Sequence, residues 1–151
     1  MNTVRIVQLD PYHKVYGLAV PLVTQRLSDG FTALGDESGI VLPQFMSRLW
    51  AKDPGVLLLA AIDPTGTIKG HAAAVYQKNS NLEAPQVIFI QPRLDEPTEN
   101  DAVTEMIEWI DRWAKTLGAG ELVLIARRVD AKWCKKHQFE VSRYILTREV
   151  K

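Results

Sequence analysis

Residues 56–62 (VLLLAAI) form an unbroken apolar run, with Pro54-Gly55 before it and Asp63-Pro64 after it. A run this short and this uniformly apolar predicts a strand that is buried on both faces. Residues 63–67 predict a tight turn, and residues 68–77 predict a second strand that pairs with the first as a hairpin. The chain therefore needs other elements to cover both sides of a sheet.

Further strands are predicted from apolar runs or from apolar–polar alternation over residues 4–9, 86–91, 121–126 and 141–148. Residues 78–85 predict a surface loop. Helical spacing of apolar residues is found over residues 42–52, 101–117 and 130–137.

Another helix is expected from about residue 14 to residue 27. Asp10-Pro11 suits its start, Pro21 is expected to kink or split it, and Ser28-Asp29-Gly30 is expected to end it. The resulting element order is β-α-α-β-β-β-α-β-α-β. It predicts an α/β (α+β) fold with a mixed central sheet and helices on both faces. No repeat or linker divides the chain, so residues 1–151 are interpreted as one domain.

The composition excludes several classes of function. The 151 residues carry 18 basic and 18 acidic side chains, so the formal net charge is zero and gives no reason to expect nucleic acid or an anionic membrane as partner. No apolar run approaches the roughly 18–20 residues of a membrane-spanning helix. The first residues do not follow the pattern of a secretory signal, and the single cysteine, Cys134, cannot form an internal disulfide. A cytoplasmic protein, or one assembled in the cytoplasm, is expected.

The element order resembles that of GNAT-type N-acetyltransferases over essentially the whole chain. Gly70 looks like the family's glycine after an apolar pair, and residues 86–91 are placed like the central strand that leads to the acetyl-CoA loop. The helix at 101–117 resembles the cofactor-side helix, and residues 131–139 resemble the family's tail. The chain is also similar to phage-encoded acetyltransferase-like proteins, some of them associated with virions. This implies a virion as an alternative location.

The loop that should hold the cofactor departs from the family. There it is basic and glycine-rich, because a pyrophosphate needs free backbone donors and a close approach at a helix start. Here it has no glycine, Pro97 lacks an N–H, and four carboxylates oppose one arginine. Its members in this sequence include Arg93, Asp95, Glu96, Pro97, Thr98, Asn100 and Asp101. We therefore expect no cofactor to bind. Acetyl-CoA is the expected cofactor only if the loop works in an altered way.

Two side chains are candidate catalytic groups if transfer chemistry survives. The resemblance places Cys134 where the family has the tyrosine that protonates the leaving thiolate, with Gln138 in place of the usual glycine. It places His71 next to the substrate groove as a candidate base. The alternative interpretations are a small core cysteine and a packed or surface histidine. The three histidines lie far apart and form no ligand pattern, so no metal site is expected.

Charge is unevenly distributed along the chain. Residues 93–111 carry seven acids and one arginine, and residues 127–151 carry eight bases and three acids. Two solvated faces are one interpretation, and a surface that docks a protein partner or a second copy is the other. Two functions remain open. One is a pseudoenzyme with a structural or interaction role, and the other is an active N-acetyltransferase.

Overall fold

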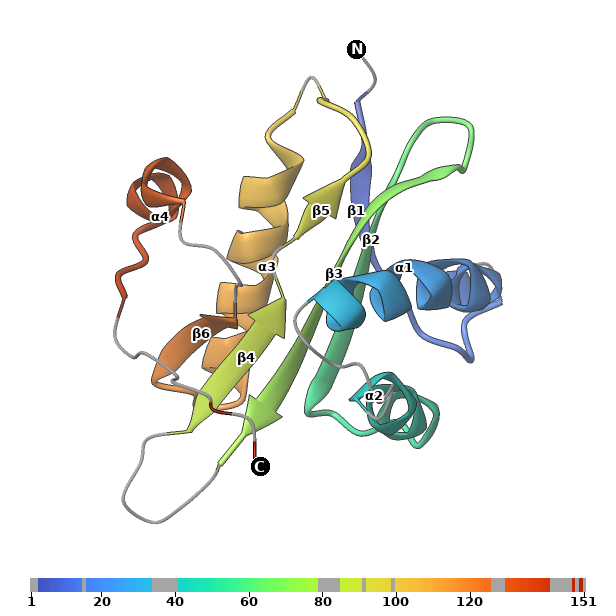
Figure 1. Cartoon of the computed structure of the whole chain (residues 1–151). Coiled ribbons are helices and arrows are strands. Elements are labelled where there is room, and N and C mark those ends of the chain that lie inside the picture. The colour runs from blue at the N-terminus through green and yellow to red at the C-terminus, as the bar shows by residue number, and fades with distance from the viewer. Residues whose placement is uncertain are drawn as a thin grey trace.

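The computed structural model describes residues 3–14, 16–33, 41–78, 85–90, 92–98, 100–125, 130–141, 148 and 150. Its centre is a sheet in which β1 (Arg5–Gln8), β2 (Val56–Ile62), β3 (Ile68–Gln77), β4 (Gln86–Ile90) and β6 (Glu121–Ile125) lie side by side in that order (Figure 1). A short strand, β5 (Arg93–Leu94), also pairs with β3.

The pairing of the strands confirms the predicted mixed sheet. β2 pairs antiparallel with both β1 and β3, and β3 pairs antiparallel with β4. β6 runs parallel to β4, with Gln86 opposite Glu121 and Ile90 opposite Ile125. A parallel neighbour needs a crossover connection. Here the helix α3 (Ala102–Thr116) provides it.

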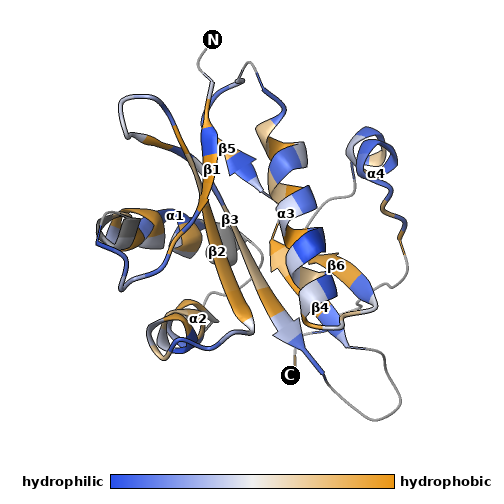
Figure 2. Ribbon diagram, turned by 180° about the vertical axis from the view of Figure 1, so that it is seen from behind, coloured by the Kyte–Doolittle hydropathy of each residue, from blue (hydrophilic) through white to orange (hydrophobic). Residues whose placement is uncertain are grey.

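Helices cover the sheet on both faces, which explains why all seven residues of β2 are buried (Figures 1 and 2). Leu57 and Leu59 point to the side covered by α3 and pack with Met106 and Ile110. The intervening β2 residues point to the side covered by α1 (Val20–Ala33) and α2 (Val41–Trp50), and they pack with Val23, Leu27, Phe45 and Leu49. Because successive side chains of a strand point to opposite faces of the sheet, this one apolar run contributes to two cores.

Local signals set the ends of these elements. In the turn between β2 and β3, the Asp63 carboxylate accepts hydrogen bonds from the backbone N–H groups of Thr65, at 3.0 Å, and Thr67, at 2.9 Å. Asp101 and Asp130 are the N-caps of α3 and of the last helix, α4 (Ala131–His137). The predicted boundaries of these elements agree with the structure to within about two residues.

The predicted first helix was wrong in its start and its end, whereas the predicted split near Pro21 agrees with a change from a 3-10 helix to an α-helix just before that residue. Residues 10–13 form a turn, a short 3-10 helix follows at Tyr16–Ala19, and α1 begins at Val20. Pro21 therefore lies in the first turn of α1, where an N–H would have no partner inside the helix. The helix continues past Gly30 because Val23 and Leu27, both fully buried, hold it against the sheet. The predicted strand at 141–148 and most of the predicted loop at 78–85 lie outside the described residues.

Candidate functional site

The segment after β4 continues along the edge of β3 as β5, which the sequence did not predict. Ala74 of β3 lies opposite Phe89 of β4, and His71 of β3 lies opposite Arg93 of β5. Between these two pairs, the segment that runs from β4 into β5 has one residue more than β3. β5 passes so close to Gly70 that a Cβ atom there would lie 2.3 Å from the carbonyl oxygen of Arg93. The glycine assigned by resemblance therefore has a structural role, because it admits β5.

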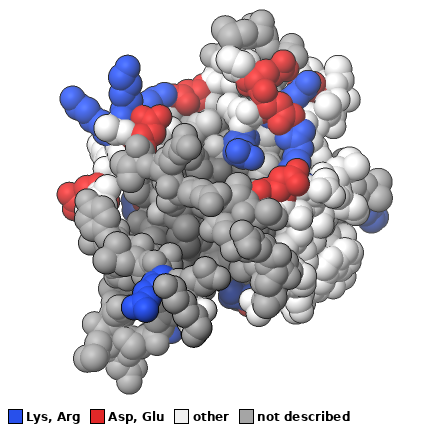
Figure 3. Space-filling model, in the orientation of Figure 1, with Lys and Arg blue, Asp and Glu red and all other residues white. Residues whose placement is uncertain are grey.

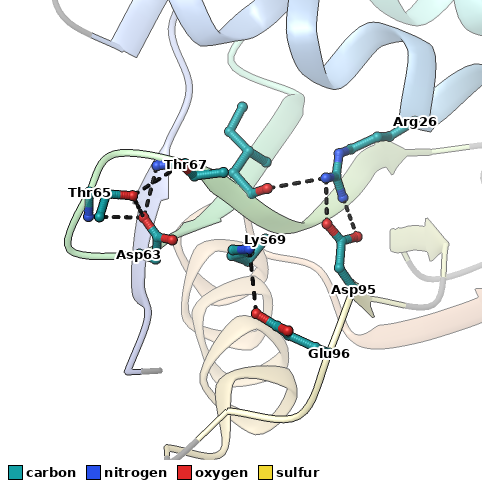
Figure 4. Close-up of polar contacts among 8 residues, drawn as sticks. Arg26, Asp63, Thr65, Thr67, Lys69, Asp95 and Glu96 are labelled. Atoms are coloured by element: carbon teal, nitrogen blue, oxygen red, sulfur yellow. Dashed lines mark hydrogen bonds and ion pairs between the residues drawn. The ribbon is translucent and has the colours of Figure 1, made fainter. Parts of the chain in front are cut away.

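Two ion pairs and a backbone hydrogen bond fix the start of the acidic loop (Figure 4). The Arg26 guanidinium on α1 donates to both oxygens of Asp95, each at 2.5 Å, and to the carbonyl oxygen of Ile68 at 3.1 Å. Lys69 lies 3.4 Å from Glu96 and its carbonyl oxygen accepts from the Asp95 N–H at 2.7 Å. The hydrogen bond from Arg26 lowers the pKa of the Asp95 carboxyl. The loop is thereby joined to α1 and to the β2–β3 hairpin.

The end of the loop is also held by its own side chains. The Asn100 amide accepts from the N–H of Val4 at 3.1 Å and donates to the carbonyl oxygen of Val4 at 3.0 Å, as a neighbouring strand would. Asp101 accepts from the N–H of Thr104 at 3.2 Å and lies 2.8 Å from the Lys136 ammonium of α4. Lys136, together with hydrogen bonds from Thr104, lowers the pKa of Asp101 to about 2.

These contacts change the electrostatic argument made from the sequence. The count of four carboxylates against one arginine omitted the cations that pair with Asp95, Glu96 and Asp101. Those cations, Arg26, Lys69 and Lys136, come from three other segments of the chain, so no local count could include them. The fourth carboxylate, Glu99, lies outside the described residues. The described part of the loop is therefore close to neutral.

At the start of α3, donors that a pyrophosphate group would use are nevertheless already engaged. The N–H of Thr104 is bound to the Asp101 carboxylate, and the N–H of Ala102 donates to the carbonyl oxygen of Asn100 at 2.9 Å. A phosphate here would have to displace a carboxylate and compete with it for Lys136. The two prolines that bracket this segment, Pro92 and Pro97, supply no N–H at all.

His71 is buried on β3 with 2% of its surface exposed, and neither ring nitrogen has a hydrogen-bond partner among the described residues. It lies opposite Ala60 in the ladder, so its side chain points to the side of the sheet that α1 covers. Burial, with smaller contributions from Arg26 and Arg93, lowers its pKa to about 4. His71 is therefore a packed, neutral imidazole at pH 7.

Cys134 lies on the other side of the molecule from His71. It is half-buried on α4, a helix in which no residue is fully buried. Trp133 of α4 and Phe139, which follows the helix, contact the core on the α3 side, and their rings stack at 5.6 Å between centroids. No hydrogen bond among the described residues joins the two candidates, so the structure does not bring them together as one catalytic pair.

Gln138 occupies the position where the family has a glycine, and the backbone shows why. As the C-cap of α4 it has φ 62° and ψ 36°, in the left-handed region that glycine adopts most readily. The substitution therefore departs from the resemblance in residue type but keeps the local conformation.

Among the hollows lined by described residues are two large ones, and neither is lined by His71 or Cys134. One, of about 950 Å³, lies beside α1, β1 and the β2–β3 turn, and Arg26 and Asp63 line it. The other, of about 580 Å³, lies between α3, β6 and the residues that follow α4. Within the described part of the chain, no three His, Cys, Asp or Glu side chains are grouped so that they could hold a metal ion.

The comparisons with known proteins support the fold. No family model matches the sequence, and no curated protein sequence matches it. A Pyrococcus furiosus protein described as an acetyl transferase superposes with a TM-score of 0.69 and 11% identity, over 97% of this chain and 99% of that one. The aminoglycoside N-acetyltransferase AAC(6′)-Iy, solved with CoA, gives a TM-score of 0.68 and 16% identity, over 99% of this chain and 96% of that one.

A predicted acetyltransferase from Clostridium acetobutylicum, solved with acetyl-CoA, gives a TM-score of 0.65 and 18% identity, over 99% of this chain and 96% of that one. Identities this low establish a common architecture and leave activity open. The chain has the fold of the GNAT-type acetyltransferases, with a mostly antiparallel central sheet between helices on both faces.

Proposed function

We propose that this protein uses the GNAT fold as an interaction module and has lost the use of acetyl-CoA. The observation that supports this proposal most is the Asp101 carboxylate at the start of α3, bound to the N–H of Thr104 and to Lys136. The carboxylate stands where the fold's cofactor phosphates need a backbone donor and the positive end of a helix. The loop before it is held by Arg26, Lys69 and Val4 and offers no glycine.

A phosphate group at this site would compete for donors that are already bound. An N-cap contributes about 1 kcal/mol to a helix, and an ammonium–carboxylate pair adds to it. A phosphate that binds here must replace both interactions before it gains any affinity. It also lacks the extra donors that a glycine-rich loop supplies. We expect a dissociation constant for acetyl-CoA above about 100 μM, which corresponds to about −5.5 kcal/mol.

Calorimetric titration with acetyl-CoA tests the proposal directly. Asp101→Ser is the matched variant, because serine caps a helix as aspartate does but carries no charge. We expect no measurable heat with the natural sequence and stronger binding for the variant. Low-micromolar binding by the natural sequence contradicts the proposal.

The alternative is an active N-acetyltransferase with an altered cofactor loop. One observation favours it: neighbours of the same fold were solved with CoA and acetyl-CoA. If transfer to an amine is measured, Cys134→Ala should reduce turnover strongly and leave the fold intact. It should have a larger effect than replacement of any histidine. Turnover unchanged by this substitution removes Cys134 from the mechanism.

The location of the protein remains a prediction. No helix in the described ranges is both long and apolar enough to cross a bilayer. A cytoplasmic location rests on the sequence pattern, and a virion-associated role rests on the resemblance to phage-encoded proteins. Fractionation of the native source, with detection by antibody, distinguishes the two.

A further inference from the structure

The groove between α3 and β6 combines an apolar base with an acidic border. Ile107, Leu122 and Phe139 contribute the apolar surface. Four carboxylates line the same groove, those of Glu108, Asp111, Glu121 and Glu140. Among the described residues, no ion pair is formed by Glu108 or by Glu140.

The helix beside this groove carries the opposite charge. Lys132 and Lys135 of α4 are exposed and form no ion pair within the described part of the chain, whereas Lys136 is bound to Asp101. Figure 3 shows basic side chains projecting from the region of α4, with acidic side chains close by. Since α4 has no fully buried residue, its outer face is available to a partner.

We propose that this surface pairs with the same surface of a second copy, so that α4 of each protomer lies over the groove of the other. A patch with an acidic half and a basic half side by side is self-complementary about a two-fold axis, because the rotation exchanges the halves. A different partner would have to present an acidic region to α4 and a basic region to the groove. The inference rests on the proposed role as an interaction module and names the partner as this chain itself.

The two-fold axis makes each charge contact occur twice. Lys132 and Lys135 of one protomer face the carboxylates of the other, and the reverse contact forms at the same time. Such exposed pairs are screened at ordinary ionic strength. Dimerisation should therefore weaken at least about tenfold between 50 and 500 mM NaCl.

Charge reversal tests the proposal by sedimentation velocity and native mass spectrometry. An acid-reversed variant carries Glu108→Lys and Glu140→Lys, and a base-reversed variant carries Lys132→Glu and Lys135→Glu. We expect each to be monomeric, since both of its contacts now join like charges. A mixture of the two should form a heterodimer, since both contacts again join opposite charges.

Lys14→Glu with Lys52→Glu is the matched control, because it makes the same charge change at two exposed residues that flank the 3-10 helix Tyr16–Ala19 and α2 and not α4 or the groove. This control should dimerise like the natural sequence. A natural protein that stays monomeric at about 200 μM in 50 mM NaCl overturns the inference, as does a dimer that survives both reversals. Acetyl-CoA binding by a dimeric protein would contradict the proposed function and leave this inference standing.

Discussion

The stability of this protein should fall as the pH is lowered from 6.5 toward 4, because His71 is buried and finds no hydrogen-bond partner in the described part of the chain. The pKa of the imidazole is about 4 in the folded protein, against 6.5 for an exposed histidine. The unfolded chain therefore binds a proton over this interval that the folded chain does not. Stability attributable to His71 is complete above pH 6.5 and is lost as the pH falls toward the folded-state value.

The size of the effect follows from the two pKa values. One pKa unit corresponds to about 1.4 kcal/mol, so the difference between 6.5 and about 4 corresponds to about 3 kcal/mol, and most of it is lost by pH 4.5. The carboxylates contribute little above pH 4.5. Their unfolded-state value is 3.8, and the pKa values of Asp53, Asp95 and Asp101 are lowered further in the folded protein.

Urea unfolding followed by tryptophan fluorescence at pH 7.5, 5.5 and 4.5 measures this loss. His71→Leu should remove most of the pH dependence. It should also raise stability at pH 7.5 by about 1–3 kcal/mol, because no unpaired polar group stays buried. His137→Gln is the control, because His137 is less buried and should leave most of the dependence intact. An equal slope for His71→Leu and the natural sequence would falsify the assignment.

Three further results are expected from thermal and chemical unfolding. Gln138→Gly should stabilise the protein by about 1 kcal/mol, because glycine adopts the left-handed backbone conformation of this C-cap without strain. No gain in stability would mean that the C-cap is unstrained. Gly70→Ala should lower the free energy of unfolding by about 2–3 kcal/mol, since its Cβ would collide with the carbonyl oxygen of Arg93. Unchanged stability would show that β5 can move away. A double-mutant cycle of Arg26→Met and Asp95→Asn should give a coupling of about 1 kcal/mol that falls in 1 M salt, and zero coupling at low salt would refute the ion pair.

The sheet was largely predictable because its signals are local. The apolar run of β2 and the turn at Asp63 fixed the hairpin, and the capped amphipathic helix α3 fixed the crossover that makes β6 parallel to β4. Pro21 was expected inside the helix and not at the start of α1, because its place in a helix depends on where that helix begins. That start is set by packing of the helix on the sheet and not by the residues around the proline.

The candidate site was predictable in composition but not in contacts. The sequence identified an acidic, glycine-free loop. However, Arg26 is 69 residues from its partner Asp95, and nothing in the residues around Arg26 indicates that the two form an ion pair. β5 was missed for the same reason, since a two-residue strand next to a proline has no periodicity to detect. The burial of His71 depends on α1. This helix covers the same face of the sheet but comes from a distant part of the sequence.

The pairing of Asn100 with Val4 has a consequence for folding kinetics. The two hydrogen bonds join residues 96 positions apart, so they can form only after β1 has been added to the sheet beside β2. We therefore expect the geometry ahead of α3 to be completed late in folding, after residues 4 and 100 have been brought together. The amide proton of Val4, followed by hydrogen exchange, consequently reports the opening of the loop at residue 100 from the far end of the sequence.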